Sequence, residues 1–239
     1  RIICITGSLE PSGVNGASAA KAGVHAWAKG LSRDIGKYGI TVNYLAPGRI
    51  HSEQIDHKLF PTPEIQAEIE HEFRRARAEP SYLPIVGGGA NGCILHYREN
   101  EAVLRAGELL LIDAGCEVDG YASDITRTFP VSGRYTQAQR DVYEMVLAAQ
   151  AVAIAATRPG VRWNEPHDAA VRVLAQGMID FGLCEGSLDK VLENGDYRRF
   201  YMHRTGHWLG LDVHDAGEYK QDGEWRVLEP GMVLTVEPG

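Results

Sequence analysis

The sequence predicts an α+β fold that is preceded by a short βαβ segment, Rossmann-like in its order of elements. Residues 1–6 and 40–46 are apolar runs of strand type, and small and apolar residues recur at helical spacing over 17–38. Beyond residue 62 the helical and strand-like patterns are grouped instead of strictly alternated. We therefore expect two parts, a βαβ fragment of residues 1–62 and a larger domain of residues 63–239.

The larger domain should begin with a charged amphipathic helix (EIQAEIEHEFRRARA) and continue into a strand-rich region. The breaker Arg158-Pro159-Gly160 then separates two long helical patterns. The later elements are expected in this order: strands near 93–97 and within 108–130, helices from Thr136 to about Thr157 and from Asn164 to about Phe181, and short strands near 200–214 and 231–237.

The composition favours a folded protein that acts on small molecules or peptides. An apolar content of 44% over 239 residues is enough for a substantial core. The net charge of -8 argues against nucleic acid as a partner, because phosphate binding needs clustered Lys and Arg. The longest apolar stretch, Val146 to Ala156, is far shorter than the ~20 residues of a membrane helix. The four cysteines form no CxxC pair, which favours thiols in a reducing compartment, most simply the cytoplasm.

Two aspartates in apolar surroundings are the first candidate metal ligands. Asp113 and Asp124 lie in two strand-like runs separated by a stretch suited to a turn, about Glu117 to Gly120. A hairpin centred between residues 118 and 119 would set the two carboxylates opposite each other, with Cβ atoms about 5 Å apart. Two acids this close would oppose each other's ionisation unless cations lay between them. The alternative is that one aspartate caps the turn and the other is exposed.

A histidine cluster and a late glutamate are the second candidate group. His203, His207 and His214 lie in HRTGHWLGLDVHD, where Gly206 and the absence of the HExxH glutamate argue against a helical zinc motif. An extended or looped segment is expected, in which histidines could also occur by chance. Glu237 ends the apolar run GMVLTVEPG, where an ordinary acid at a strand end is the simpler interpretation.

Together these motifs resemble, in order and spacing, the catalytic domain of Xaa-Pro aminopeptidases (aminopeptidase P), which are pita-bread metallopeptidases. The resemblance covers about 175 residues and rests on PSYLPIVGGGANGCILHYREN, IDAGCEVDGYASDITRTFPV, YMHRTGHWLGLDVHD and EPGMVLTVEPG. It implies that Asp113, Asp124, His207 and Glu237 bind two divalent ions, for which this donor set favours Mn²⁺.

The same resemblance implies roles for the remaining residues. A water shared by the two ions would attack the peptide bond between the first residue and a following proline, and Glu237 would carry the proton. His96, His203 and His214 would act on the substrate carbonyl and the oxyanion, and Tyr82 would line the pocket for the first residue.

The family pattern also includes a fifth ligand, a glutamate expected beyond Gly239, so we expect low activity from this chain. A catalytically silent metal-binding or scaffold fragment is therefore the alternative, and whether subunits associate is left open.

Residues 1 to 60 resemble part of the short-chain dehydrogenase/reductase family, in GASAAKAG and GITVNYLAPGRIHSE. Ser8 is a loose counterpart of that family's catalytic serine. Ala17 stands where the family has its tyrosine, four residues before Lys21. This substitution argues against reductase activity. A G-x-G-x-x-G match in residues 87–92 precedes a strand-like run, not a helix, so a backbone turn is expected there instead of a nucleotide site.

Overall fold

The computed structural model describes residues 2–5, 42–45 and 62–239, and side chains are described from residue 62 onward. The strands are β1 (Ile2–Ile5), β2 (Val42–Leu45), β3 (Glu79–Pro80), β4 (Ile85–Gly88), β5 (Leu109–Asp113), β6 (Cys116–Glu117), β7 (Thr126–Pro130), β8 (Lys220–Gln221) and β9 (Glu224–Trp225). The α-helices are α3 (Thr62–Arg75), α4 (Gln137–Ala156), α5 (Asn164–Asp180) and α6 (Leu188–Asn194), with 3₁₀ turns at η2 (Gly89–Cys93) and η3 (Asp196–Arg199).

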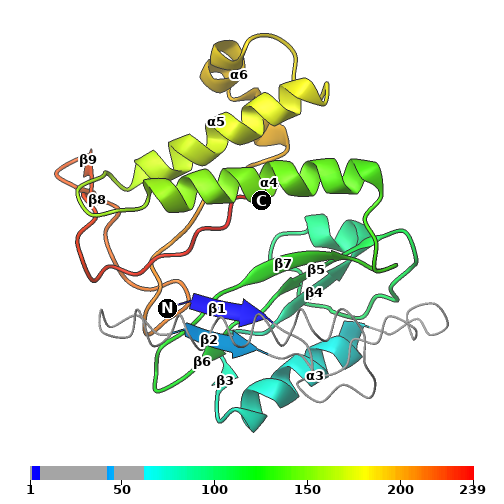
Figure 1. The fold of residues 1–239 in the computed structure, drawn as a ribbon. Coiled ribbons are helices and arrows are strands. Elements are labelled where there is room, and N and C mark those ends of the chain that lie inside the picture. Colours follow the sequence, from blue (N-terminus) through cyan, green and yellow to red (C-terminus); the bar gives the residue numbers. More distant parts are fainter. Residues whose placement is uncertain (1, 6–41, 46–61) are drawn as a thin grey trace.

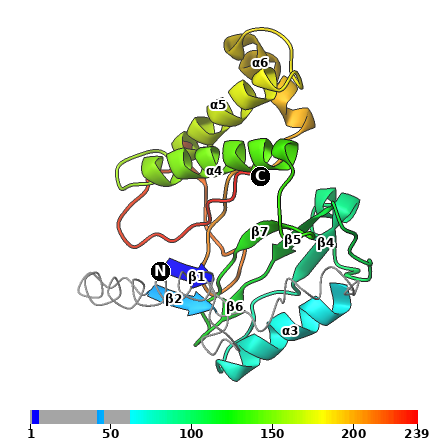
Figure 2. The same ribbon diagram turned by 45° about the vertical axis from the view of Figure 1, so that its right-hand side comes forward.

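The largest sheet is antiparallel, in the order β4-β5-β7. It lies between α3 on one side and the α4–α5 pair on the other, and the carboxy-terminal segment runs beneath α4 (Figures 1 and 2). Ile65 and Ile69 of α3 pack against a buried cluster that includes Val86 and Leu110 of the sheet. The α3 face that carries these isoleucines therefore holds the helix on β4.

Helices α4 and α5 form the second core of the domain. Thr136 begins α4 with a reciprocal capping box, in which its hydroxyl accepts from Gln139 N and the Gln139 side chain accepts from Thr136 N. Ala149 of α4 and Leu174 of α5 are almost fully buried between the helices. A Cβ at Gly177 would lie 2.2 Å from Met145 Sδ. Small residues thus let the two helices approach closely.

The long helices are where the sequence predicts them, whereas the strand expected at 93–97 is wrong. The strand in this region is β4, and η2 follows it directly. Ile94 and Leu95 are more than half exposed, and His96 has a φ of 55°. These apolar residues have no sheet face to cover, so the chain turns instead of extending. The glycine pattern at residues 87–92 leads into this turn and not into an α-helix.

A single buried side chain connects the elements around this turn. The Oδ1 atom of Asn100 accepts from Val86 N at 2.9 Å, and its Nδ2 donates to Pro84 O at 2.6 Å and to Gln66 Oε1 at 2.8 Å. Asn100 is 1% exposed and has a φ of 48°, a conformation that Asn tolerates better than most residues. Its amide thereby joins α3 to the edge of the sheet.

The two strands expected at the start of the chain are both present and pair in parallel, with Ile2 opposite Val42. The helix expected over 17–38 lies outside the described residues. Short strands expected near 200–214 and 231–237 occur only as an isolated bridge between Trp208 and Leu234 with flanking backbone hydrogen bonds. Among the described helices, none is long and apolar enough to cross a membrane.

Candidate metal centre

Asp113 and Asp124 lie on a hairpin whose register differs from the expected one by two residues. Asp113 ends β5 opposite Thr126, and Ala114 N donates to Ile125 O. The cause is the turn: Asp119 and Gly120 have φ values of 53° and 74°, which make a tight two-residue connection centred between them. The shift is even, so Asp124 still shares the sheet face of Asp113 and stands diagonal to it, not opposite.

The Tyr82 hydroxyl joins the two aspartates. It lies 2.8 Å from Asp124 Oδ1 and also within hydrogen-bonding reach of Asp113 Oδ1. A hydroxyl has one proton, so it can donate to only one of the two carboxylates at a time. The other carboxylate needs a proton or a cation. The expected place of Tyr82 beside the first substrate residue stays a prediction, and its hydroxyl contacts the two aspartates.

His207 and Glu237 are brought together by backbone pairing between two segments far apart in the chain. Glu237 N donates to Thr205 O at 2.7 Å, and Thr235 N donates to His207 O at 3.0 Å. The Thr235 hydroxyl accepts from His207 N at 3.0 Å and donates to Glu237 Oε1 at 2.8 Å. This pairing places His207 Nε2 3.1 Å from Glu237 Oε1.

The same imidazole joins the two halves of the site. His207 Nε2 lies 3.2 Å from Asp124 Oδ2. Ligand atoms of Asp124, His207 and Glu237 all lie within 4.8 Å of one another. The other ring nitrogen, Nδ1, lies 2.9 Å from Trp208 O and must donate to that carbonyl, which leaves Nε2 as the ligand atom of the neutral ring.

The pKa values of these groups diverge for identifiable reasons. Burial raises the pKa of Asp113 to about 6, and the Asp124 charge adds to the rise. Burial also acts on Asp124, but hydrogen bonds from His207 and Tyr82 outweigh it and lower the pKa of that carboxyl. Burial opposes protonation of His207, yet its bonds to Asp124 and Glu237 raise the pKa of the imidazole to about 10. The site therefore holds protons that a metal ion would displace.

The three other expected histidines occupy different places around this cluster. The His214 ring centroid is 4.1 Å from that of His207 and 6.0 Å from that of His96. Both His96 and His214 are exposed, so they border the cluster on its solvent side. His203 packs edge-on against Tyr201, and its Nδ1 donates to Arg204 O at 2.8 Å.

Several residues that support the site were not predicted. The Thr235 hydroxyl accepts from His207 N and donates to Glu237 Oε1, and the Thr205 carbonyl accepts from Glu237 N. Isolated threonines have no spacing pattern that would distinguish them in a sequence. Their role depends on a strand pairing that only the folded chain makes visible.

Comparison with known proteins identifies the family. The model of metallopeptidase family M24 matches residues 45–239. The chain belongs to this family. It is 55% identical over 177 residues to the Xaa-Pro aminopeptidase of Haemophilus influenzae (74% of this chain, 41% of the relative) and 53% identical over 176 residues to that of Escherichia coli (73% and 40%). The chain thus spans about two fifths of the length of these curated relatives.

Solved M24 structures share its fold. Aminopeptidase PepP of Pseudomonas aeruginosa has a TM-score of 0.75 at 40% identity, over 100% of this chain and 59% of that chain. Zinc-substituted Escherichia coli aminopeptidase P in complex with product has a TM-score of 0.73 at 37% identity, over 98% and 59%. These M24 neighbours support the pita-bread fold expected for the larger domain. They give no support to the short-chain dehydrogenase resemblance of residues 1 to 60.

Proposed function

We propose that this chain carries the catalytic site of a metal-dependent aminopeptidase that removes the first residue from peptides with proline second. The observation that carries this proposal is that ligand atoms of Asp124, His207 and Glu237 lie within 4.8 Å of one another. Asp113 is joined to this group by the Tyr82 hydroxyl, which is within hydrogen-bonding reach of both aspartates. The relatives named as Xaa-Pro aminopeptidases support the choice of substrate.

The donor set fits divalent cations. Three carboxylates, of Asp113, Asp124 and Glu237, face one imidazole and one hydroxyl, so the cluster has more negative charge than its own protons neutralise. Hard oxygen ligands with one imidazole favour Mn²⁺ over a thiolate-type zinc site, and we propose two such ions. His207, Glu237 and Asp124 would hold one ion tightly. Asp113 and Asp124 would hold the second ion more weakly, because they supply no imidazole.

Side chains around the metal centre would bind and orient the peptide. When bound, divalent ions would polarise the peptide carbonyl and lower the pKa of a nearby water. Glu237, whose side chain is 32% exposed, can both bind a cation and carry a proton toward the proline nitrogen. His96 and His214 border the cluster from the solvent side, where the carbonyl oxygen of a peptide would arrive.

Hydrolysis of matched peptides tests this function. We expect the wild-type chain to release the first residue from an Xaa-Pro-Xaa tripeptide in the presence of Mn²⁺. Release should be at least tenfold faster than from the corresponding Xaa-Ala-Xaa tripeptide, which corresponds to a difference of about 1.4 kcal/mol in activation free energy. Asp124→Ala should abolish it. Tight Mn²⁺ binding without hydrolysis would favour a catalytically silent metal-binding fragment, and no binding of Mn²⁺ would contradict the proposal.

We propose a reducing compartment, the cytoplasm, because Cys93, Cys116 and Cys184 are free thiols in the described part of the chain.

A further inference from the structure

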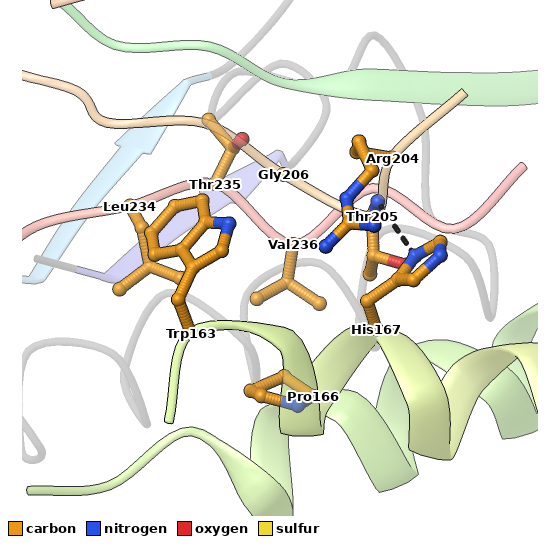
Figure 3. Close-up of a pocket in the computed structure, with 9 residues that line it drawn as sticks. All are labelled: Trp163, Pro166, His167, Arg204, Thr205, Gly206, Leu234, Thr235 and Val236. Atoms are coloured by element: carbon orange, nitrogen blue, oxygen red, sulfur yellow. Dashed lines mark hydrogen bonds between the residues drawn. The ribbon is translucent and has the colours of Figure 1, made fainter. Parts of the chain in front are cut away.

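A partly buried hydrogen-bond chain outside the metal centre links helix α5 to the segment that carries His207. The Thr205 hydroxyl lies 2.9 Å from Nδ1 of His167 and 2.6 Å from the hydroxyl of Tyr201. Thr205 is 4% exposed and Tyr201 3% exposed. Figure 3 shows His167 reaching from α5 to Thr205 at one side of a small pocket that Arg204 also lines.

The direction of each bond in this chain follows from one backbone contact. Thr205 N donates to His167 Nδ1 at 3.3 Å, so this nitrogen carries no proton. His167 is therefore neutral, with its proton on Nε2. The Thr205 hydroxyl then shares the single lone pair of Nδ1 with this N–H, and Tyr201 donates to Thr205. Burial and the nearby Arg204 charge lower the pKa of His167 to about 4, which keeps this arrangement intact at neutral pH.

Thr205 also helps to align the two ligand-bearing segments. Its carbonyl accepts Glu237 N at 2.7 Å. Two residues further on, His207 O accepts from Thr235 N, and the side chains of His207 and Glu237 face each other at 3.1 Å. A rotation or slip of Thr205 would therefore separate His207 from Glu237.

We propose that His167 is a positioning residue for the metal centre. By accepting from both the backbone N–H and the hydroxyl of Thr205, it holds this segment in the register in which His207 and Glu237 reach a common ion. The inference rests on the proposed metal site and adds to it a residue on α5 that is not itself a proposed ligand.

Two substitutions at His167 separate positioning from packing. His167→Phe keeps a ring but removes the acceptor, whereas His167→Asn keeps an acceptor near the position of Nδ1. We expect His167→Phe to weaken Mn²⁺ binding by about tenfold in calorimetric titration, and His167→Asn to restore most of that loss. His71→Phe, on the exposed side of α3, is the matched control and should bind Mn²⁺ as the wild type does.

A second pair covers the case in which His167→Phe does not fold. Thr205→Val removes the hydroxyl and keeps the shape, and Thr205→Ser restores the hydroxyl. We expect weaker binding for Val and near-wild-type binding for Ser. The ¹⁵N resonances of the His167 ring give a readout without metal: Nδ1 should be unprotonated between about pH 5 and pH 8, and its shift should change in Thr205→Val.

Each outcome supports or overturns a distinct statement. Wild-type affinity in His167→Phe, equal loss in His167→Asn and His167→Phe, or a protonated Nδ1 would overturn the positioning role alone. Failure of the wild-type chain to bind Mn²⁺ would overturn the proposed function instead, and with it the role of His167 toward a metal.

Discussion

Binding of a divalent ion to this site should release protons in a number set by pH. The pKa of His207 is raised to about 10 and that of Asp113 to about 6, and both groups must be deprotonated to act as ligands. Near pH 7.5 His207 should therefore release about one proton and Asp113 almost none. Near pH 5 Asp113, a proposed ligand of the second ion, should release most of a proton when that ion binds.

The sign of the pH dependence follows from this count. The metal-bound state has fewer protons, so affinity rises with pH. With one proton displaced, we expect the affinity for Mn²⁺ to increase about tenfold per pH unit between about pH 6 and pH 8. Asp113 belongs to the proposed second site, so the affinity of that weaker site should depend on pH mainly below the pKa of Asp113, about 6.

Calorimetry in buffers of different ionisation enthalpy measures the number of protons directly. For the wild type near pH 7.5 we expect about one proton per tightly bound ion. His207→Gln should bind more weakly and release close to none, while the control His71→Gln should behave as the wild type does. A wild-type chain that releases no protons near pH 7.5, or whose affinity is constant from about pH 6 to pH 8, would refute this account of the electrostatics.

Four substitutions test other parts of the structure. Asp124→Ala should reduce Mn²⁺ affinity by more than about a hundredfold, and a smaller loss would show that it does not join two ions. His203→Ala and His214→Ala should lower peptide turnover while Mn²⁺ affinity changes by less than about threefold; loss of metal would contradict their assignment to the substrate. Leu174→Ala, at a side chain 2% exposed, should cost about 2–5 kcal/mol in urea unfolding, and a cost near zero would contradict burial of this side chain between α4 and α5.

The helices were predictable because their signals are local. Thr136 with Gln139 is a capping box, and the α4 and α5 patterns are separated by Pro159-Gly160. Helix α6 was missed, although Ser187 caps its first turn and Gly195 ends it with a φ of 74°. Seven residues are too few for a periodic pattern to distinguish a helix from a loop.

The sequence singled out candidate residues that the structure brings together, but it did not predict how they pair. The Asp113–Asp124 spacing placed both carboxylates on one sheet face, although a turn one residue later than expected changed the register by two. The strand predicted at 93–97 is absent. Ile94 and Leu95 are apolar but exposed, so their hydrophobicity was a misleading signal for a buried strand. The contact between His207 and Glu237 depends on backbone bonds between distant segments, for which the sequence contains no local signal.

The contact between Asp124 and His207 spans 83 positions of the chain. An ion held by both residues would therefore act as a reversible cross-link that closes a long loop, between the sheet and the segment beneath α4 (Figure 1). Because such an ion binds only the folded chain, its contribution to stability grows with its concentration, by about 2.7 kcal/mol at a hundred times the dissociation constant. Metal supply would then govern the lifetime of the protein as well as the proposed turnover of peptides.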